Sequence, residues 1–313
     1  MRQLVASLFF LAATAVSGQG NVIRIVVPFA AGGVQDIVAR SFNAELGAAL
    51  GRSVIVENRP GAGGTVGTGS VAKAAPDGTT LILAAASHTI AGSLYSKLAY
   101  DPIADFTGVA HIGSVDYVLM VNSGVPALNV RDFVLFLKNN PGKLNYATAG
   151  NGSATHLSMA YFCGLAGVEM VHIPYKATGE AVNEVLAGRA HAVIAANIGA
   201  LPYAKDGRVR MLGATGATRS KFLPELPAIA ESLPGYEFDS WIALLAPAAT
   251  PRPLVDQVSA AVAGLLKDPV VLGRLDKQGV VPQAMTPDAL NALLKADFQK
   301  MARVVKASGA RID

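Results

Sequence analysis

The sequence predicts an α/β protein of two lobes, each built from a sheet flanked by helices. Two observations predict this fold class. Strand-like apolar runs alternate with helix-like periodic segments in the first third of the chain, and the same alternation starts again near residue 117. Such alternation is typical of a parallel sheet covered by helices on both faces. A chain of 313 residues is also long enough for two domains.

The first lobe is predicted to follow a β-α-β-α-β order. Its first helix ends at Gly51, because apolar residues recur at helical spacing up to Leu50 and a glycine commonly follows a helix. We expect the glycine-rich residues 58–69 to be irregular and to lead into a second helical segment. The predicted strands are residues 23–27, 53–57 and 79–85.

The second lobe repeats this pattern, and two amphipathic helices close the chain. One closing helix follows Pro251 and Pro253, and the other begins at Pro287 after the capping residue Thr286. The predicted strands of the second lobe are residues 117–121, 144–147, 170–173, 191–195 and 209–214, and its predicted helices lie at 130–139, within 150–167 and at 179–187.

Residues 1–20 are predicted to form a secretory signal peptide. Arg2 precedes an apolar run that is too short to span a bilayer, and the small residues Ala15 and Ser17 suit a signal peptidase, which places the mature N-terminus near Gly18. A buried N-terminal helix is the alternative. No later segment offers about eighteen uninterrupted apolar residues, so we expect an exported product that does not span a membrane.

Composition argues against several classes of function. The net charge is only +4 and no lysine or arginine block occurs, so nucleic acid is not an expected partner. Cys163 is the single cysteine and cannot form an internal disulfide, and the five histidines lack H-x-x-x-H spacing, which gives a metal site little support. No serine lies in a G-x-S-x-G hydrolase pattern. We expect no cofactor and no metal.

The turn IRIVVPFAAGGVQD, residues 23–36, is the most informative candidate binding loop. A strand stops at a proline, the chain crosses small residues, and a helix starts, so unpaired N–H groups and the helix dipole favour a carboxylate or a phosphate. Gly32 and Gly33 let the backbone approach such an anion. Asp36 either stabilises the first turn of its helix or pairs with an amine of the ligand.

A second loop, ATAGNGSATH at residues 147–156, repeats this chemistry. Asn151, Ser153 and Thr155 add side-chain donors, so each loop is expected to grip one end of a diacid. Alternatively, Ser153 only caps its helix. Ligands of open α/β sheets gather beyond the carboxyl ends of strands, which places both loops at one cleft.

Other motifs have two interpretations each. Gly67, Gly69 and Ala72 match a G-x-G-x-x-A dinucleotide pattern, but no strand leads into it and no acidic residue follows at the usual distance, so we interpret the segment as a loop. His88 and His156 are either hydrogen-bond donors in the cleft or structural histidines.

Together, these segments resemble the Bug-type periplasmic solute receptors, the extracytoplasmic binding proteins of tripartite tricarboxylate transporters. The resemblance covers nearly the whole mature chain, and the order and spacing of the stretches make it specific. The stretches are IRIVVPFAAGGVQDIVAR, VIVENRPGAGGTVGTGSVAKAAPDGTTL, NPGKLNYATAGNGSATHLSMAYF, HIPYKATGEAVNEVLAGRAHAVIAAN and WIALLAPAATP.

The resemblance implies a two-lobed periplasmic-binding-protein, or Venus flytrap, fold. Lobe 1 would comprise residues 21–120 plus 243–313 and lobe 2 residues 121–242, with crossing strands near Leu119 and Ile242 as the hinge. A small carboxylic acid would be held between the lobes by backbone amides and bridging waters. The implied ligand-binding residues are Phe29, Ala30, Gly33, Gln35, Asp36, Ser87, His88, Asn151, Gly152, Ser153, Ala154, Thr155, His156 and Asn197.

Three positions depart from the family pattern. Threonine or serine is commoner at the position of Gln35, glutamate at that of Tyr161, and glycine at that of Ala177. The longer Gln35 either narrows the pocket or supplies another hydrogen bond.

The expected function is that of a non-enzymatic receptor which closes its lobes on a small carboxylic acid for uptake. The acid is a di- or tricarboxylate, an aromatic acid or an acidic amino acid. We expect a periplasmic monomer that meets membrane transporter subunits. One alternative is a sensor that presents the acid to a membrane signalling partner. An enzyme using His88 or His156 as a base is a weaker alternative, because the sequence pairs neither with a nucleophile, metal or carboxylate.

Overall fold

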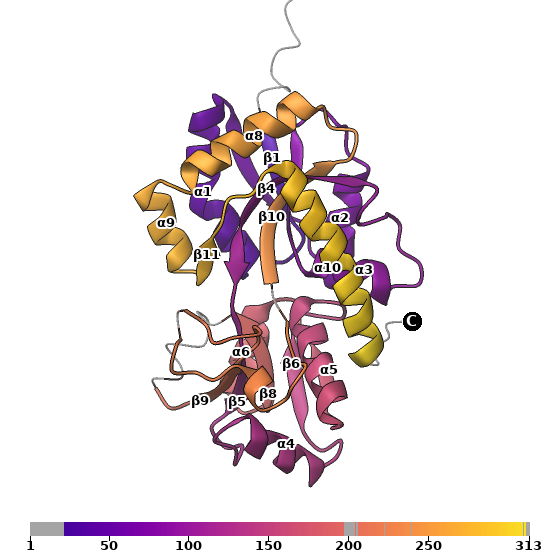
Figure 1. Cartoon of the computed structure of the whole chain (residues 1–313), viewed down its shortest axis with the longest axis vertical. Coiled ribbons are helices and arrows are strands. Elements are labelled where there is room, and N and C mark those ends of the chain that lie inside the picture. Colours follow the sequence, from indigo (N-terminus) through magenta and orange to yellow (C-terminus); the bar gives the residue numbers. More distant parts are fainter. Residues whose placement is uncertain are drawn as a thin grey trace, which may run out of the picture.

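The computed structural model describes residues 22–196, 204, 206–221, 223–238, 240–308 and 310, and these form two sheets with helices around each (Figure 1). The expected signal peptide and Asn197 lie outside the described residues. None of the described helices is both long enough and apolar enough to cross a membrane.

The first sheet has six strands in the order β11-β4-β10-β3-β1-β2. β1 pairs in parallel with β2 and β3, whereas β10 is antiparallel to both of its neighbours. The sheet is therefore mixed and not wholly parallel as predicted, because a late strand of the chain enters between β3 and β4. The strands are β1 (Val22–Val27), β2 (Ser53–Asn58), β3 (Thr80–Ala85), β4 (Phe106–Val115), β10 (Ser240–Pro247) and β11 (Val280–Pro282).

Helices cover this sheet, and one of them corrects the sequence-based expectation for residues 58–69. A 3-10 turn, η2 (Ala62–Gly64), leads directly into helix α2, so Gly67 and Gly69 are helical. A Cβ at Gly67 would lie 2.7 Å from the carbonyl oxygen of Arg59 and 2.9 Å from Pro28 Cα, so glycine lets α2 pack closely on the strand ends. The helices are α1 (Val34–Leu50), α2 (Thr65–Ala72), α3 (Ser87–Leu94), α8 (Arg252–Leu265), α9 (Pro269–Asp276) and α10 (Pro287–Ser308).

The second sheet has five strands in the order β7-β6-β8-β5-β9. β6 is parallel to β7 and β8, and β5 is antiparallel to β8 and β9. The predicted strands and helices of this lobe are present, with ends shifted by one or two residues. The elements are β5 (Tyr117–Asn122), α4 (Val130–Lys138), β6 (Asn145–Thr148), α5 (Ala154–Ala166), β7 (Val171–Pro174), α6 (Thr178–Leu186), β8 (Ala192–Ala196), β9 (Val209–Ala214) and the 3-10 turn η3 (Ile229–Glu231).

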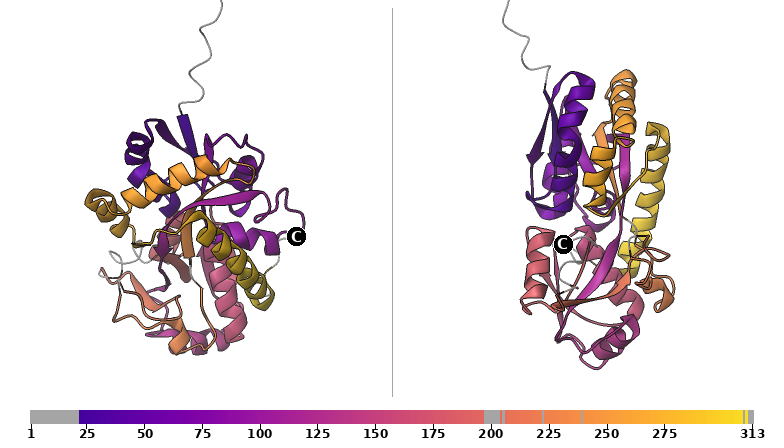
Figure 2. Two further views of the ribbon diagram at one scale, coloured as in Figure 1. Left: turned by 45° about the horizontal axis from the view of Figure 1, so that its top comes forward. Right: turned by 90° about the vertical axis from the view of Figure 1, so that its left-hand side faces the viewer.

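The chain passes between the sheets at Asp116, which joins β4 to β5, and again just before β10. These passages lie a few residues ahead of Leu119 and Ile242. Helix α10 also spans both lobes, as Figure 2 shows. Its Leu294 packs in a core cluster of the first lobe, while its Met301 packs with α5 in a cluster that joins second-lobe residues to Ile90 and Leu94 of α3. Burial of each such side chain contributes about 1.5–3 kcal/mol, so α10 ties the lobes together.

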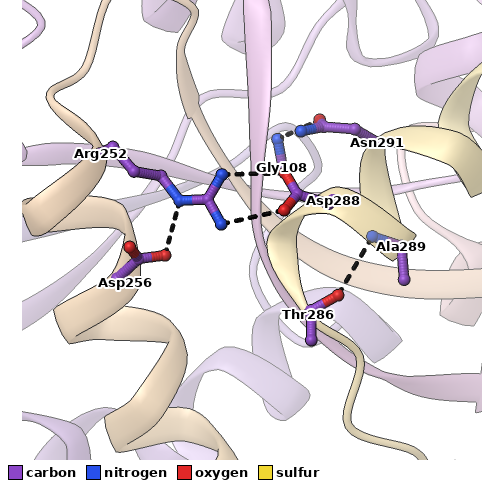
Figure 3. Close-up of polar contacts among 7 residues, drawn as sticks. All are labelled: Gly108, Arg252, Asp256, Thr286, Asp288, Ala289 and Asn291. Atoms are coloured by element: carbon purple, nitrogen blue, oxygen red, sulfur yellow. Dashed lines mark hydrogen bonds and ion pairs between the residues drawn. The ribbon is translucent and has the colours of Figure 1, made fainter.

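Polar contacts at the start of α10 attach it to the first lobe (Figure 3). Arg252 of α8 pairs with Asp256 at 2.7 Å and with both carboxylate oxygens of Asp288 at 2.8 and 3.1 Å. These exposed pairs orient the helices more than they stabilise them. Asn291 accepts a 2.7 Å hydrogen bond from the N–H of Gly108 in β4, next to a register shift between β4 and β10. The predicted Thr286 cap is present, because its hydroxyl accepts from the N–H of Ala289 at 3.2 Å.

Candidate functional site

A pocket lies between the two sheets and is lined by residues of both lobes. Its empty volume is about 610 Å³, including space open to solvent. None of the described lining residues carries a charge. They are Phe29, Ala30, Gly33, Val34, Gln35, Ala85, Ser87, Val115, Tyr117, Ala149, Ser153, Ala154, Thr155, Ala177, Thr178, Ala196, Ser240 and Ile242.

The N-termini of four helices meet at this pocket. Gly33 precedes α1, Ser87 opens α3, Ser153 precedes α5 and Ala177 precedes α6, and all four residues line the pocket. Neither Gly33 nor Ala177 has a side chain that caps its helix, so the first N–H groups of α1 and α6 have no side-chain acceptor there. Unpaired N–H groups and helix dipoles attract anions. The pocket therefore offers positive potential from the backbone alone.

The loop before α1 is organised by Asp36. One carboxylate oxygen accepts from the N–H of Gly32 at 2.9 Å, and the other pairs with Arg40 Nε at 2.9 Å. Gly32 has φ +83°, a conformation that favours glycine. Asp36 is buried and does not line the pocket. The structure thus places Asp36 in the first turn of its helix, which is the structural one of its two predicted roles.

Gln35 lines the pocket with an unused donor. Its Nε2 atom is buried and has no hydrogen-bond partner among the described residues. A buried donor without a partner costs about 1–3 kcal/mol. An acceptor on a bound molecule would relieve this cost, so Gln35 is suited to a ligand oxygen.

The hydroxyl groups of the β6–α5 loop are committed within the loop. Ser153 donates to the carbonyl oxygen of Gly150 at 2.7 Å and accepts from the N–H of His156 at 3.2 Å. Because the Ser153 proton is used there, Thr155 donates to Ser153 across 2.9 Å, and it accepts from the N–H of Ala149 at 2.9 Å. Ser153 therefore caps α5 and lines the pocket, and both hydroxyls organise the loop.

Two histidines support the same loop from behind. The rings of His156 and His172 stack with centroids 4.1 Å apart, and Tyr146 stacks on His172 at 5.0 Å. His156 Nδ1 accepts from the N–H of Gly152 at 3.2 Å. Burial lowers the pKa of each histidine to about 4, and for His156 the neighbouring His172 adds to the shift. Neutral His156 can accept that bond, so its role is to hold the loop.

The remaining predicted site residues lie apart from the pocket lining. His88 Nε2 donates to the carbonyl oxygen of Pro102 at 2.7 Å, and its ring packs edge-on against Phe106 at 4.7 Å. Burial lowers the pKa of His88 to about 4. Asn151 is exposed, Gly152 is buried, and neither lines the pocket. Within the described part of the chain, no three His, Cys, Asp or Glu side chains are grouped so as to hold a metal ion.

Comparison with known proteins identifies the family. The model of the tripartite tricarboxylate transporter family receptor matches residues 38–310. The chain belongs to this receptor family.

Three solved structures are similar to the receptor. The periplasmic binding protein BugD is 33% identical with a TM-score of 0.85, over 92% of this chain and 98% of that chain. An R. palustris protein solved with adipate is 32% identical with a TM-score of 0.87, over 93% and 98%. MatC from Rhodopseudomonas palustris, solved with bound malate, is 33% identical with a TM-score of 0.84, over 91% and 98%. The periplasmic-binding-protein fold expected from the sequence is confirmed.

The three departures from the family pattern occupy different places in this receptor. Gln35 and Ala177 line the pocket, and Ala177 precedes α6. Tyr161 lies elsewhere: its hydroxyl donates to the carbonyl oxygen of Gly235 at 2.8 Å, and its ring stacks on Tyr236 at 5.3 Å. Gln35 and Ala177 are therefore the departures that shape the pocket of this receptor.

Sequence reasoning missed the pocket residues that the crossing strands supply. Val115 and Tyr117 flank the first passage between the sheets, and Ser240 and Ile242 lie at the second. The crossing segments could have indicated these residues, because a chain segment that joins two lobes passes beside the cleft between them.

Proposed function

We propose that the chain is an extracytoplasmic solute receptor that binds a small carboxylic acid between its lobes for uptake. The observation that carries this proposal is the meeting of four helix N-termini at a pocket whose described lining has no charged side chain. Backbone N–H groups can hold a carboxylate without a cation. A second carboxylate would fit the same pocket, because N-termini from both lobes face it.

The proposed contacts are those predicted residues that line the pocket. α1 and its loop contribute from the first lobe, and α5 contributes from the second. The N–H groups at the start of α6 form a further donor set, beside Ala177 and Thr178. The proposed ligand-binding residues are Phe29, Ala30, Gly33, Gln35, Ser87, Ser153, Ala154 and Thr155.

Two observations support one class of acid over the others. Relatives with about one third identity were solved with adipate and malate, which are both dicarboxylates. Phe29, Val115 and Ile242 give this pocket apolar lining alongside its polar groups. We therefore rank dicarboxylates first, ahead of tricarboxylates, aromatic acids and acidic amino acids.

Export and partners complete the proposal. Residues 1–20 would direct the chain to the periplasm, where it would meet transporter subunits as a monomer. We assign the elements up to β4, together with β10 and the elements after it, to lobe 1, and the elements from β5 to η3 to lobe 2; this moves the expected bounds of 21–120 plus 243–313 and 121–242 by a few residues. Presentation of the bound acid to a membrane sensor is the alternative outcome. An enzymatic role has less support, because His88 and His156 are bonded away from the pocket.

Binding can be tested by calorimetry and thermal unfolding with a panel of mono-, di- and tricarboxylates, aromatic acids and acidic amino acids. A ligand at 100 times its Kd should add about 2.7 kcal/mol to the free energy of unfolding. The uncharged diamide of each active acid is the matched control, because it keeps the carbon skeleton and removes the carboxylates. The absence of binding to every acid in the panel, or equal binding of acids and diamides, would contradict carboxylate recognition. Mass spectrometry of the recovered acid tests for turnover.

A further inference from the structure

First-lobe residues touch the β6–α5 loop of the second lobe beside the pocket. The hydroxyl of Tyr95, at the end of α3, lies 2.8 Å from the carbonyl oxygen of Ala62 and 3.2 Å from that of Asn151. A tyrosine hydroxyl has one proton, so the two carbonyls share it. Asn151 lies two residues before Ser153, which lines the pocket. Tyr95 thus links η2 of one lobe to the anion-binding loop of the other.

Gly63 brings the two backbones into direct contact. A Cβ at Gly63 would lie 2.1 Å from the carbonyl oxygen of Asn151 and 3.0 Å from the hydroxyl of Tyr95, so no side chain fits there. The adjacent Gly64 packs on the ring of Phe29, since a Cβ at Gly64 would lie 3.3 Å from Phe29 Cζ. Phe29 lines the pocket. The turn η2 therefore stands between a wall of the pocket and the opposite lobe.

We propose that Gly63 and Tyr95 form a closure contact with Asn151, which holds the lobes together over the bound acid. This inference rests on the proposed receptor function. Gly63 and Tyr95 do not line the pocket, so they act as positioning residues that stabilise the closed state. A contact made when the lobes are closed raises the population of the closed state in the ligand-free protein and in the complex, and so slows release of the ligand.

The bond to Ala62 gives Tyr95 a fixed position from which to act. Both Ala62 and Tyr95 belong to the first lobe, so their 2.8 Å bond does not depend on the position of the second lobe. Opening of the cleft removes only Asn151 from the shared hydroxyl. Closure therefore adds a contact to a group that is already oriented, without ordering a free side chain.

Two variants test the contact by calorimetry and stopped-flow release with an acid found in the panel. Tyr95→Phe removes the hydroxyl, and we expect roughly two- to tenfold weaker binding through faster release, the range of one hydrogen bond. Gly63→Ala places a methyl group against Asn151, and we expect affinity to fall by about tenfold or more because the lobes cannot close fully.

Matched controls separate closure from general damage. Tyr161→Phe removes a hydroxyl that donates to Gly235 at 2.8 Å within the second lobe, and it should leave ligand release unchanged. Gly142 has φ +67°, close to the +63° of Gly63, and a Cβ at Gly142 would meet nothing within 4 Å. Gly142→Ala thus carries the same backbone strain without the interlobe collision, and it should bind as the unaltered protein does.

Small-angle X-ray scattering of the ligand-free proteins separates this proposal from the receptor function. We expect a larger radius of gyration for Gly63→Ala than for Gly142→Ala, a result that needs no ligand. If no acid binds the unaltered protein, the proposed receptor function is wrong. The radii of the ligand-free glycine variants still show whether Gly63 holds the lobes together. Equal radii for the two glycine variants, or equal affinities where an acid binds, would overturn the closure contact.

Discussion

Asp116 and Tyr117 are neighbours in the sequence and line different cavities. Tyr117 faces the pocket between the lobes, whereas Asp116 faces a second cavity on the other side of the crossing segment, whose empty volume is about 1110 Å³ including space open to solvent. The alternation extends back along the strand, because Val115 lines the pocket and Ser114 the second cavity. Successive side chains of an extended chain point to opposite sides. If the lobes rotate about this segment, narrowing of the pocket must widen the second cavity.

Filling the second cavity should therefore tighten ligand binding. Gln283 lines it from the first lobe and is held by its main chain, whose N–H donates to Ile112 at 3.1 Å and whose carbonyl accepts from His111 at 2.6 Å. Gln283→Trp keeps these bonds and opposes narrowing of the cavity, so we expect a several-fold lower Kd and slower release. Ala284→Trp, at the adjacent exposed position, is the control. Equal affinity in the two variants would contradict rotation about Asp116.

Local periodicity predicted many elements of the fold but missed β4, β11, α3 and α9. Long-range pairing explains two further errors. Strand β10 is buried throughout, and nothing in its composition shows that it enters between β3 and β4 in the opposite direction. Helix α2 starts at Thr65 despite two glycines, each of which costs about 1 kcal/mol in a helix. Close packing on Pro28 and Arg59 needs the first of them, Gly67, and this requirement is visible only in three dimensions.

The candidate site was predicted best where its chemistry is local. The loops before α1 and α5 were found because a strand end, small residues and a helix start occur together in the sequence. The position of His88 could not be found in this way, since its partner Pro102 lies fourteen residues further along an irregular segment. The direction of the Ser153 and Thr155 protons likewise depends on which acceptors lie within reach.

Gln35→Met should separate ligand binding from stability. Methionine keeps the length of the side chain and removes the buried Nε2 donor that has no partner among the described residues. We expect up to about tenfold weaker binding of the preferred acid, together with an unchanged or higher melting temperature for the ligand-free protein. Gln35→Glu should weaken binding further, because a carboxylate would face the bound anion. Unchanged affinity in Gln35→Met would contradict a ligand contact.

Thr155→Val should destabilise the ligand-free protein as well as weaken binding. The substitution keeps the shape and leaves the N–H of Ala149 without its 2.9 Å acceptor. An unsatisfied buried group of this kind costs about 1–3 kcal/mol, which urea denaturation measures. Ser158→Ala is a suitable control, because Ser158 lies in the same helix, its hydroxyl donates to the backbone carbonyl of Thr155 at 3.2 Å, and Ser158 does not line the pocket. Equal stability in Thr155→Val and the unaltered protein would instead favour a hydroxyl that is free for the ligand.

Stability should fall as the solution is acidified from about pH 6.5 to about pH 4. His88, His156 and His172 have pKa values lowered to about 4 from a usual value of 6.5, with burial as the main cause. Between these values the unfolded chain binds protons that the folded chain does not, so acid favours unfolding. For the fully buried His88, the difference in pKa corresponds to about 3 kcal/mol.

Urea denaturation at pH 7.5 and pH 4.5 measures the loss of stability on acidification. His88→Phe tests how much of this loss is due to His88. Phenylalanine preserves the ring that packs on Phe106 but leaves the carbonyl oxygen of Pro102 without its donor. We therefore expect lower stability at pH 7.5 and a smaller further loss on acidification than in the unaltered protein. Ligand affinity at pH 7.5 should stay the same, because His88 does not line the pocket. If His88→Phe stays folded but loses much of its affinity, His88 contacts the ligand, as the sequence had suggested.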